Sequence, residues 1–232
     1  MTGTKVSTGV LRRPIWHALT TRQSGLAAGT PRARRFPFDV SPFAATAQDD
    51  PASLAALLPL AVPGQPLVFL QEGPIATPPG LVEEFRGSGV QMTATCVDAP
   101  DRTADVLDLG DDDAADMLAL ATLTRPGPFL SRTNTLGAFV GIRDDYGRLV
   151  AMAGERLCVE GHTEVSGVCT HPDARGHGHA ALLSGIVAGR ILDRGETPFL
   201  HAFAANRTAI DLYSRLGFVV SRDVSVAAFR RP

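Results

Sequence analysis

The residues best suited to chemistry in this chain lie at positions 165–181, VSGVCTHPDARGHGHAA. An apolar run at residues 165–170 predicts a buried strand, and the amphipathic segment after residue 180 predicts a helix. Between them stands Arg175-Gly176-His177-Gly178-His179-Ala180. Glycines let a backbone approach a ligand closely, and a helix N-terminus offers unpaired N–H groups at the positive end of its dipole. This segment is therefore predicted to bind the phosphates of a cofactor.

One interpretation of the glycines is a dinucleotide-binding loop, because Gly176-x-Gly178-x-x-Ala181 matches the pattern G-x-G-x-x-G/A. In that fold the strand runs almost directly into the first glycine, and an acid that binds the ribose follows roughly 20 residues later. Here residues 171–175 intervene, and Asp193 and Glu196 precede the next apolar run at residues 199–203. The spacing therefore disfavours a dinucleotide.

Two motifs resemble those of the GNAT superfamily of N-acetyltransferases. Arg175-x-x-Gly178-x-Ala180 is similar to the Arg/Gln-x-x-Gly-x-Gly/Ala sequence that holds the pyrophosphate of acyl-CoA in that superfamily. The segment from Asn206 through Ala209 and Tyr213 to Gly217-Phe218 resembles its Asn-x-x-Ala-x-x-x-Tyr-x-x-x-Gly-Phe motif. The resemblance covers residues 105–231, and this half of the chain is most similar to the glycine N-acyltransferase-like branch.

The resemblance implies acetyl-CoA as a co-substrate and no metal. It implies that backbone N–H groups of the glycine loop hold the pyrophosphate and that the preceding strand pairs with the pantetheine amides. The cofactor-binding residues implied in this way are Val168, Cys169, Thr170, Arg175, Gly176, His177, Gly178, His179, Ala180, Asn206 and Tyr213. An acyl-enzyme role for Cys169 would need a base that forms the thiolate, and no clear partner is evident, so core packing is favoured.

Acetylation of an amine needs a free base, since an ammonium ion has no lone pair, and a general base supplies it. Glu164 is our candidate, because it lies on the strand that leads to the glycine loop and coincides with the glutamate that histone-type members of the superfamily use. We expect burial to raise its pKa. The alternative is a structural carboxylate paired with an arginine. Glu155, Glu160 and His171 are further candidates.

Tyr213 is the candidate acid that protonates the departing thiolate. A phenol has an ordinary pKa near 10, and the second motif places this residue one helical turn after the small Ala209. The alternative is a tyrosine that only packs in the core. Asn206 is well suited to cap the same helix, and Gly217 to end it.

These residues predict an acetyl-CoA-dependent N-acetyltransferase in which a primary amine attacks the thioester directly. Two alternatives stay open: a non-catalytic CoA-binding regulatory protein, and an amino-acid N-acyltransferase that uses other acyl-CoAs. The acceptor is expected to be a small molecule or a peptide. Its groove is expected in loops such as residues 125–135, because binding residues concentrate in loops.

Composition excludes several other classes. The chain has 232 residues, 44% hydrophobic and 20% charged, with a net charge of −2. It offers no basic surface, so nucleic acid is not an expected partner. No apolar run reaches the roughly 20 residues of a membrane span, and no signal peptide is recognised. Three cysteines without C-x-x-C spacing are expected to be reduced thiols of a cytoplasmic protein. A homodimer is compatible with these features.

The elements that must position these residues predict a mixed α/β fold. From residue 105 the order is strand, helix, loop or second helix, three strands, glycine loop, helix, strand, helix and strand, which is the order of the GNAT fold. We therefore expect a GNAT domain at residues 103–232. A smaller α/β region at residues 1–102, of unclear role and compatible with a degenerate GNAT-like half, should precede it. Its expected helices are residues 15–26, 53–60 and 81–86, and its expected strands 66–70 and 90–97.

Overall fold

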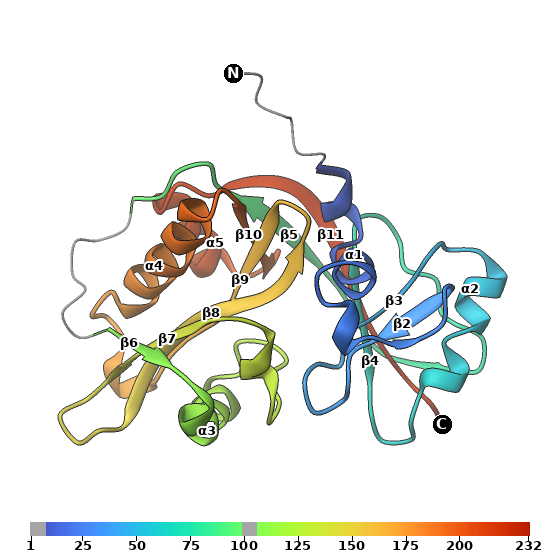
Figure 1. Cartoon of the computed structure of the whole chain (residues 1–232), viewed down its shortest axis with the longest axis horizontal. Helices are drawn as coiled ribbons and strands as arrows, with labels where there is room; N and C mark the ends of the chain where they lie inside the picture. Colours follow the sequence, from blue (N-terminus) through green and yellow to red (C-terminus); the bar gives the residue numbers. More distant parts are fainter. Residues whose placement is uncertain (1–7, 99–105) are drawn as a thin grey trace.

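The computed structural model describes residues 8–98 and 106–232 and centres on one mixed sheet of eight strands (Figure 1). The strand order is β4-β11-β5-β10-β9-β8-β7-β6. The bounds are β4 Leu67–Gln71, β5 Val82–Thr93, β6 Leu107–Leu109, β7 Phe139–Arg143, β8 Leu149–Val159, β9 His162–Thr170, β10 Thr197–Phe203 and β11 Val219–Arg230. With helices on both faces, this arrangement confirms the predicted mixed α/β class.

Strands β9 and β10 diverge in the middle of this sheet. They pair in parallel only where residues 197–199 meet residues 162–164. Beyond that point each strand keeps only the partner on its other edge: β9 stays paired with β8, and β10 stays paired with β5 up to Phe203. The edge of β9 after Glu164 that would face β10 is therefore free of strand pairing.

Helices cover the two faces of the sheet. They are α3 (Ala114–Thr124), α4 (His179–Asp193) and α5 (Arg207–Arg215). Leu183 and Val187 of α4 pack with Val140 in one buried cluster, whereas Met117 of α3 packs with Phe139 in another. Because neighbouring strand residues point to opposite faces, α3 and α4 lie on opposite sides of β7. The two helices predicted at the motifs are present as α4 and α5, and each begins within two residues of its expected start.

The N-terminal elements lie mostly at the β4–β11 end of the sheet (Figure 1), and the first of their helices contacts β8 as well as β4. They are α1 (Pro14–Thr20), α2 (Pro51–Ala55) and a small antiparallel sheet of β1 (Ala28–Gly29), β2 (Ala33–Arg35) and β3 (Ala44–Thr46). Short 3₁₀ helices are Thr8–Arg12, Ser24–Leu26, Leu58–Leu60, Asp111–Asp113, Thr133–Leu136 and Pro172–Ala174. None of the helices in the described residues is long and apolar enough to cross a membrane.

Three local predictions for this region are wrong. The first helix ends at Thr20. The second begins at Pro51, because the carboxylate of Asp50 accepts the N–H groups of Ala52 and Ser53 and caps it ahead of our expected position. The expected helix at 81–86 belongs instead to the long strand β5, which pairs along its whole length with β11. Strand pairing here overrides local pattern.

The expected boundary at residues 100–103 lies largely outside the described residues. Strands β4 and β5, which precede it, pair with β11 and β10, which follow it. The large sheet is therefore built from both sides of that position. The division of the chain into residues 1–102 and 103–232 stays a prediction.

Candidate active site

A cavity of about 720 Å³ lies where β9 and β10 diverge. Part of its lining comes from the free end of β9, the glycine loop and α5. Another part is apolar and comes from the N-terminal region and from β11, with Phe43, Val68, Leu70, Phe85, Val224 and Val226. Arg156, His201 and the loop at residues 125–128 complete the wall. The volume is in the range of small-ligand sites, roughly 300–1,000 Å³.

Most of the predicted cofactor residues line this cavity. They are Val168, Cys169, Thr170, Arg175, Ala180, Asn206 and Tyr213. Gly176, His177, Gly178 and His179 do not line it; they form the turn between Arg175 and Ala180. The tertiary structure thus brings together two motifs that stand about thirty residues apart in the sequence.

The glycine loop has the conformation that its sequence indicates. Gly176 and Gly178 have φ angles of +84° and +77°, which residues with a side chain rarely adopt. Nothing lies within 4 Å of where a Cβ would stand at either position. Gly178 is the N-cap of α4, and no side chain caps the helix there. The rings of His177 and His179 stack with centroids 5.7 Å apart. Because the N-cap residue is a glycine, it brings no side chain to this end of α4, and the space beside the two glycines is open.

Glu164 differs from our expectation. It is fully buried and does not line the cavity. Arg156 donates to its carboxylate from Nε at 2.9 Å and Nη2 at 2.7 Å, and Nδ1 of His201 lies 2.7 Å from Oε1. Burial alone would raise the pKa of Glu164, but the charge of Arg156 and these hydrogen bonds lower it to about 2. The expectation of a raised pKa is therefore wrong. The geometry is that of our alternative, a carboxylate paired with an arginine.

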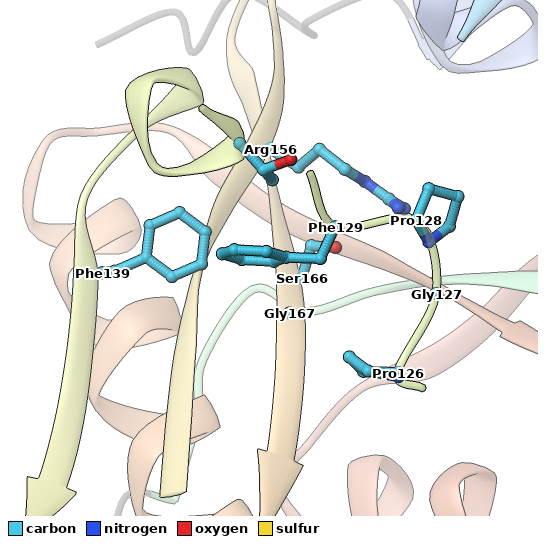
Figure 2. Close-up of a pocket in the computed structure, with 9 residues that line it drawn as sticks. Pro126, Gly127, Pro128, Phe129, Phe139, Arg156, Ser166 and Gly167 are labelled. Atoms are coloured by element: carbon cyan, nitrogen blue, oxygen red, sulfur yellow. The ribbon is translucent and has the colours of Figure 1, made fainter. Parts of the chain in front are cut away.

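Arg156 is a cavity residue that the sequence analysis missed. Its side chain reaches from β8 towards Pro128 (Figure 2), and its Cζ lies 4.7 Å from the centre of the Phe43 ring. Sequence pattern alone does not reveal this ion pair. A bulge between Glu155 and Cys158 shifts the register of β8 on β9 where Arg156 meets Glu164, and nothing in the sequence marks that bulge.

His201, on β10, is the second cavity residue that we missed. Its Nδ1 contacts Glu164, and its Nε2 lies 2.9 Å from Nε2 of Gln91. Because the carboxylate is ionised, Nδ1 donates to it, and Nε2 then accepts from the Gln91 amide. His201 is thus in contact with both Glu164 and the cavity. A lone histidine on a strand gives no signal of this role in the sequence.

Three further candidates from the sequence, Tyr213, Cys169 and Asn206, line the cavity. Tyr213 lines the cavity, packs edge-on against Phe218 and has a pKa that burial raises to about 12. Burial also raises the pKa of Cys169, to about 11, which disfavours a thiolate nucleophile. Asn206 caps α5 as predicted, since its side chain accepts the N–H of Ala209 at 3.2 Å.

The three further base candidates do not line the cavity. Glu155 pairs with Arg194 at 2.8 Å, Glu160 is exposed at a turn, and Nδ1 of His171 accepts the N–H of Asp173. Within residues 8–98 and 106–232, no group of three or more His, Cys, Asp or Glu residues could hold a metal ion.

Comparison with known proteins identifies the family. The model of the FR47-like protein family matches residues 139–226. The crystal structure of a protein from Novosphingobium aromaticivorans, named as a member of the GNAT family, is 38% identical; the match covers 96% of this chain and 98% of that one, with a TM-score of 0.89. The chain therefore belongs to the GNAT family, whose acetyltransferases use acetyl-CoA as co-substrate.

More distant structures share the fold. A GCN5-related N-acetyltransferase from Kribbella flavida is 19% identical, with 96% of each chain covered and a TM-score of 0.61. A GCN5-related N-acetyltransferase-like protein from Streptococcus suis is 17% identical, with 94% of this chain and 92% of that one covered and a TM-score of 0.57. No curated protein matches the sequence significantly. The resemblance to the glycine N-acyltransferase-like branch stays a prediction.

Proposed function

We propose that this protein is an acetyl-CoA-dependent N-acetyltransferase that acetylates a primary amine by direct attack. The observation that carries the proposal is the divergence of β9 and β10. It leaves residues 168–170 of β9 without a strand partner on the side facing β10, on the wall of a 720 Å³ cavity, and just before the glycine loop. An extended ligand with amide groups can pair with such an edge as a further strand would.

The cofactor would be held along this edge and at the loop. Backbone groups of residues 168–170 would pair with the pantetheine amides, and the N–H groups around Gly178 would receive the pyrophosphate, with Arg175 adding positive charge. Asn206, the N-cap of α5, and Tyr213, within that helix, line the same cavity and would lie beside the thioester end. This placement brings the acetyl group towards Arg156, His201 and the apolar wall, where an acceptor has room.

In the reaction, the amine nitrogen forms a bond to the carbonyl carbon, the C–S bond breaks, and the sulfur leaves as a thiolate. We assign Tyr213 as the acid that protonates this sulfur, because its hydroxyl stays protonated at neutral pH with a pKa raised to about 12. The proton that the amine loses needs a different acceptor. Glu164 has no surface on the cavity, so we propose that it acts through His201.

His201 can take that proton if the Gln91 amide turns. Gln91 Nε2 now donates to the imidazole and to the Leu11 carbonyl, whereas its buried Oε1 has no hydrogen-bond partner in the described residues. Rotation of the amide would let this oxygen accept from a protonated Nε2. The ionised Glu164 would then stabilise the imidazolium from its other side.

Titration with acetyl-CoA tests the cofactor site. Gly178→Glu places a negative charge where the pyrophosphate would lie, and Gly178→Gln is the matched control, since both variants meet the same backbone cost at φ +77°. We expect calorimetry to show acetyl-CoA binding lost in the Glu variant and largely retained in the Gln variant. Equal affinity of a folded Glu variant and the wild type would contradict the site.

Thiol release from acetyl-CoA with a panel of primary amines tests the activity. Turnover of at least one amine by the wild type, and its loss in Gly178→Glu, is the expected result. Binding of CoA without turnover of any amine would replace the proposal with our alternative, a CoA-binding regulatory protein.

A further inference from the structure

The charges on the cavity wall restrict the acceptor. The charged side chains that line it are Arg125, Arg156 and Arg175, and no Asp or Glu among the described residues lines it. A buried ammonium group without an anionic partner is costly. An acceptor with a second positive charge, such as a polyamine or a lysine-rich peptide, is therefore a poor fit.

Arg125 and Arg156 line the cavity together with the loop at residues 125–128. Arg175 belongs to the glycine loop, where phosphate charge is expected. The Nη1 atom of Arg156 lies 4.0 Å from where a Cβ of Gly127 would stand. Figure 2 shows the guanidinium beside Pro128, and the next residue, Phe129, packs against Phe139 in the adjacent core. The loop that begins at Arg125 thus packs against Arg156.

Arg156 is fixed in place before any ligand arrives. Its Nε and Nη2 donate to Glu164, and its face rests on Phe43. Its Nη1 makes no hydrogen bond within residues 8–98 and 106–232. The outer edge of the guanidinium therefore keeps N–H groups for a second planar anion, and little side-chain entropy remains to be lost. Because Glu164 neutralises its charge, Arg156 adds directed donors more than net charge.

Arg125 supplies the net charge. It is exposed on the cavity wall, and none of the ion pairs within the described residues involves it. Its φ is +52°, and every other residue with a positive φ in the described ranges is a glycine. For a residue with a Cβ atom, this left-handed backbone conformation costs roughly 1–2 kcal/mol. This conformation ends α3, because Arg125 is its C-cap and donates its N–H to the carbonyl of Ala121, and it leaves the side chain on the cavity wall.

We propose that the acceptor is a small amine that carries both a carboxylate and an apolar side chain, as an apolar α-amino acid does. The carboxylate would meet Arg156 and Arg125, and the side chain would pack on Phe43, Val68 and Leu70. This inference rests on the proposed function and names its substrate class.

Binding of product-like ligands tests the inference without turnover. N-acetyl-L-leucine and N-acetyl-L-leucinamide have the same shape and differ in the carboxylate. Titrated into the CoA-saturated protein, the acid should bind on the order of tenfold more tightly than the amide, the size of one hydrogen bond to a charged group. Equal binding, tighter binding of the amide, or no binding of either ligand would overturn the inference.

Two variants locate the effect. Arg125→Gly removes the charge and relieves the strained φ, so the fold should be kept, and the preference for the acid should shrink several-fold. Arg231→Gly removes an exposed arginine outside the cavity and should leave the preference unchanged. A full preference in Arg125→Gly would overturn the assignment of Arg125.

Thiol release with L-leucine and with 3-methylbutylamine separates this inference from the proposed function. The two amines share a side chain, and only L-leucine has a carboxylate. Equal turnover of both amines would leave the acetyltransferase proposal standing and overturn the inference that the acceptor is recognised through a carboxylate. Preferred binding of N-acetyl-L-leucine without turnover of any amine would support the carboxylate-binding site and overturn the acetyltransferase proposal.

Discussion

Replacing Glu164 by glutamine tests the buried pair at the centre of this site. The carboxylate has no exposed surface and accepts two hydrogen bonds from Arg156. Glu164→Gln keeps the shape of the side chain but leaves the guanidinium buried without its counter-charge. We therefore expect a loss of folding stability as well as of activity.

The structure gives the size and the pH dependence of this loss. The pKa of Glu164 falls from 4.5 to about 2, and one pKa unit is worth about 1.4 kcal/mol, so ionisation contributes on the order of 3 kcal/mol. The folded-state pKa is the lower one. This stability is therefore complete above about pH 4.5 and is lost as the pH falls towards 2. Glu164→Gln should cost about 3 kcal/mol at pH 7 and progressively less below pH 4.5.

Urea unfolding at a series of pH values measures this difference. Glu84→Gln is the matched control, because Glu84 forms an ion pair with Arg230 in which both side chains are over 40% exposed. Such surface pairs contribute roughly 0–1 kcal/mol. If Glu164→Gln is no more destabilising than Glu84→Gln at pH 7, the argument for a buried, strongly coupled pair is refuted.

The pH dependence of the rate separates two roles of the same carboxylate. With a pKa of about 2, Glu164 stays ionised throughout a neutral assay, so it cannot produce a limb of the profile there. If His201 takes the proton, Glu164→Gln should lower kcat/KM at neutral pH without removing the acid limb of the profile, because the imidazolium that forms in the reaction loses its carboxylate. Complete disappearance of that limb would return the role of base to Glu164 itself.

Two further predictions concern residues on the cofactor side of the cavity. Tyr213→Phe keeps the ring that packs on Phe218, so acetyl-CoA affinity should be close to normal, while kcat and kcat/KM fall together in the thiol-release assay; equal turnover would leave Tyr213 as a packing residue. Cys169→Ala should keep turnover within a few-fold, and intact-protein mass spectrometry should find no acetylated enzyme, because burial holds the pKa of this thiol at about 11; a covalent acetyl adduct on Cys169 would contradict direct attack.

Features that depend on a few neighbouring residues could be predicted from the sequence. The glycines of the loop adopt positive φ, and Asn206 caps α5. The strand expected at residues 165–170, the apolar run at residues 199–203 and the helices at the two motifs correspond closely to β9, β10, α4 and α5. Conformational freedom, capping and hydrophobic periodicity are local properties, so the order of residue types is enough to reveal them. The same local signals carried the resemblance to the GNAT family.

Long-range contacts decided the rest. Residues 82–86 form part of a strand because β11, more than a hundred residues later, pairs with them. The apolar wall of the cavity includes Phe43, Val68 and Phe85, from outside the recognised motifs. The pKa of Glu164 is the sharpest case. Burial and an arginine shift a carboxyl pKa in opposite directions, and only the placement of Arg156 and His201 around that carboxylate determines which of the two prevails.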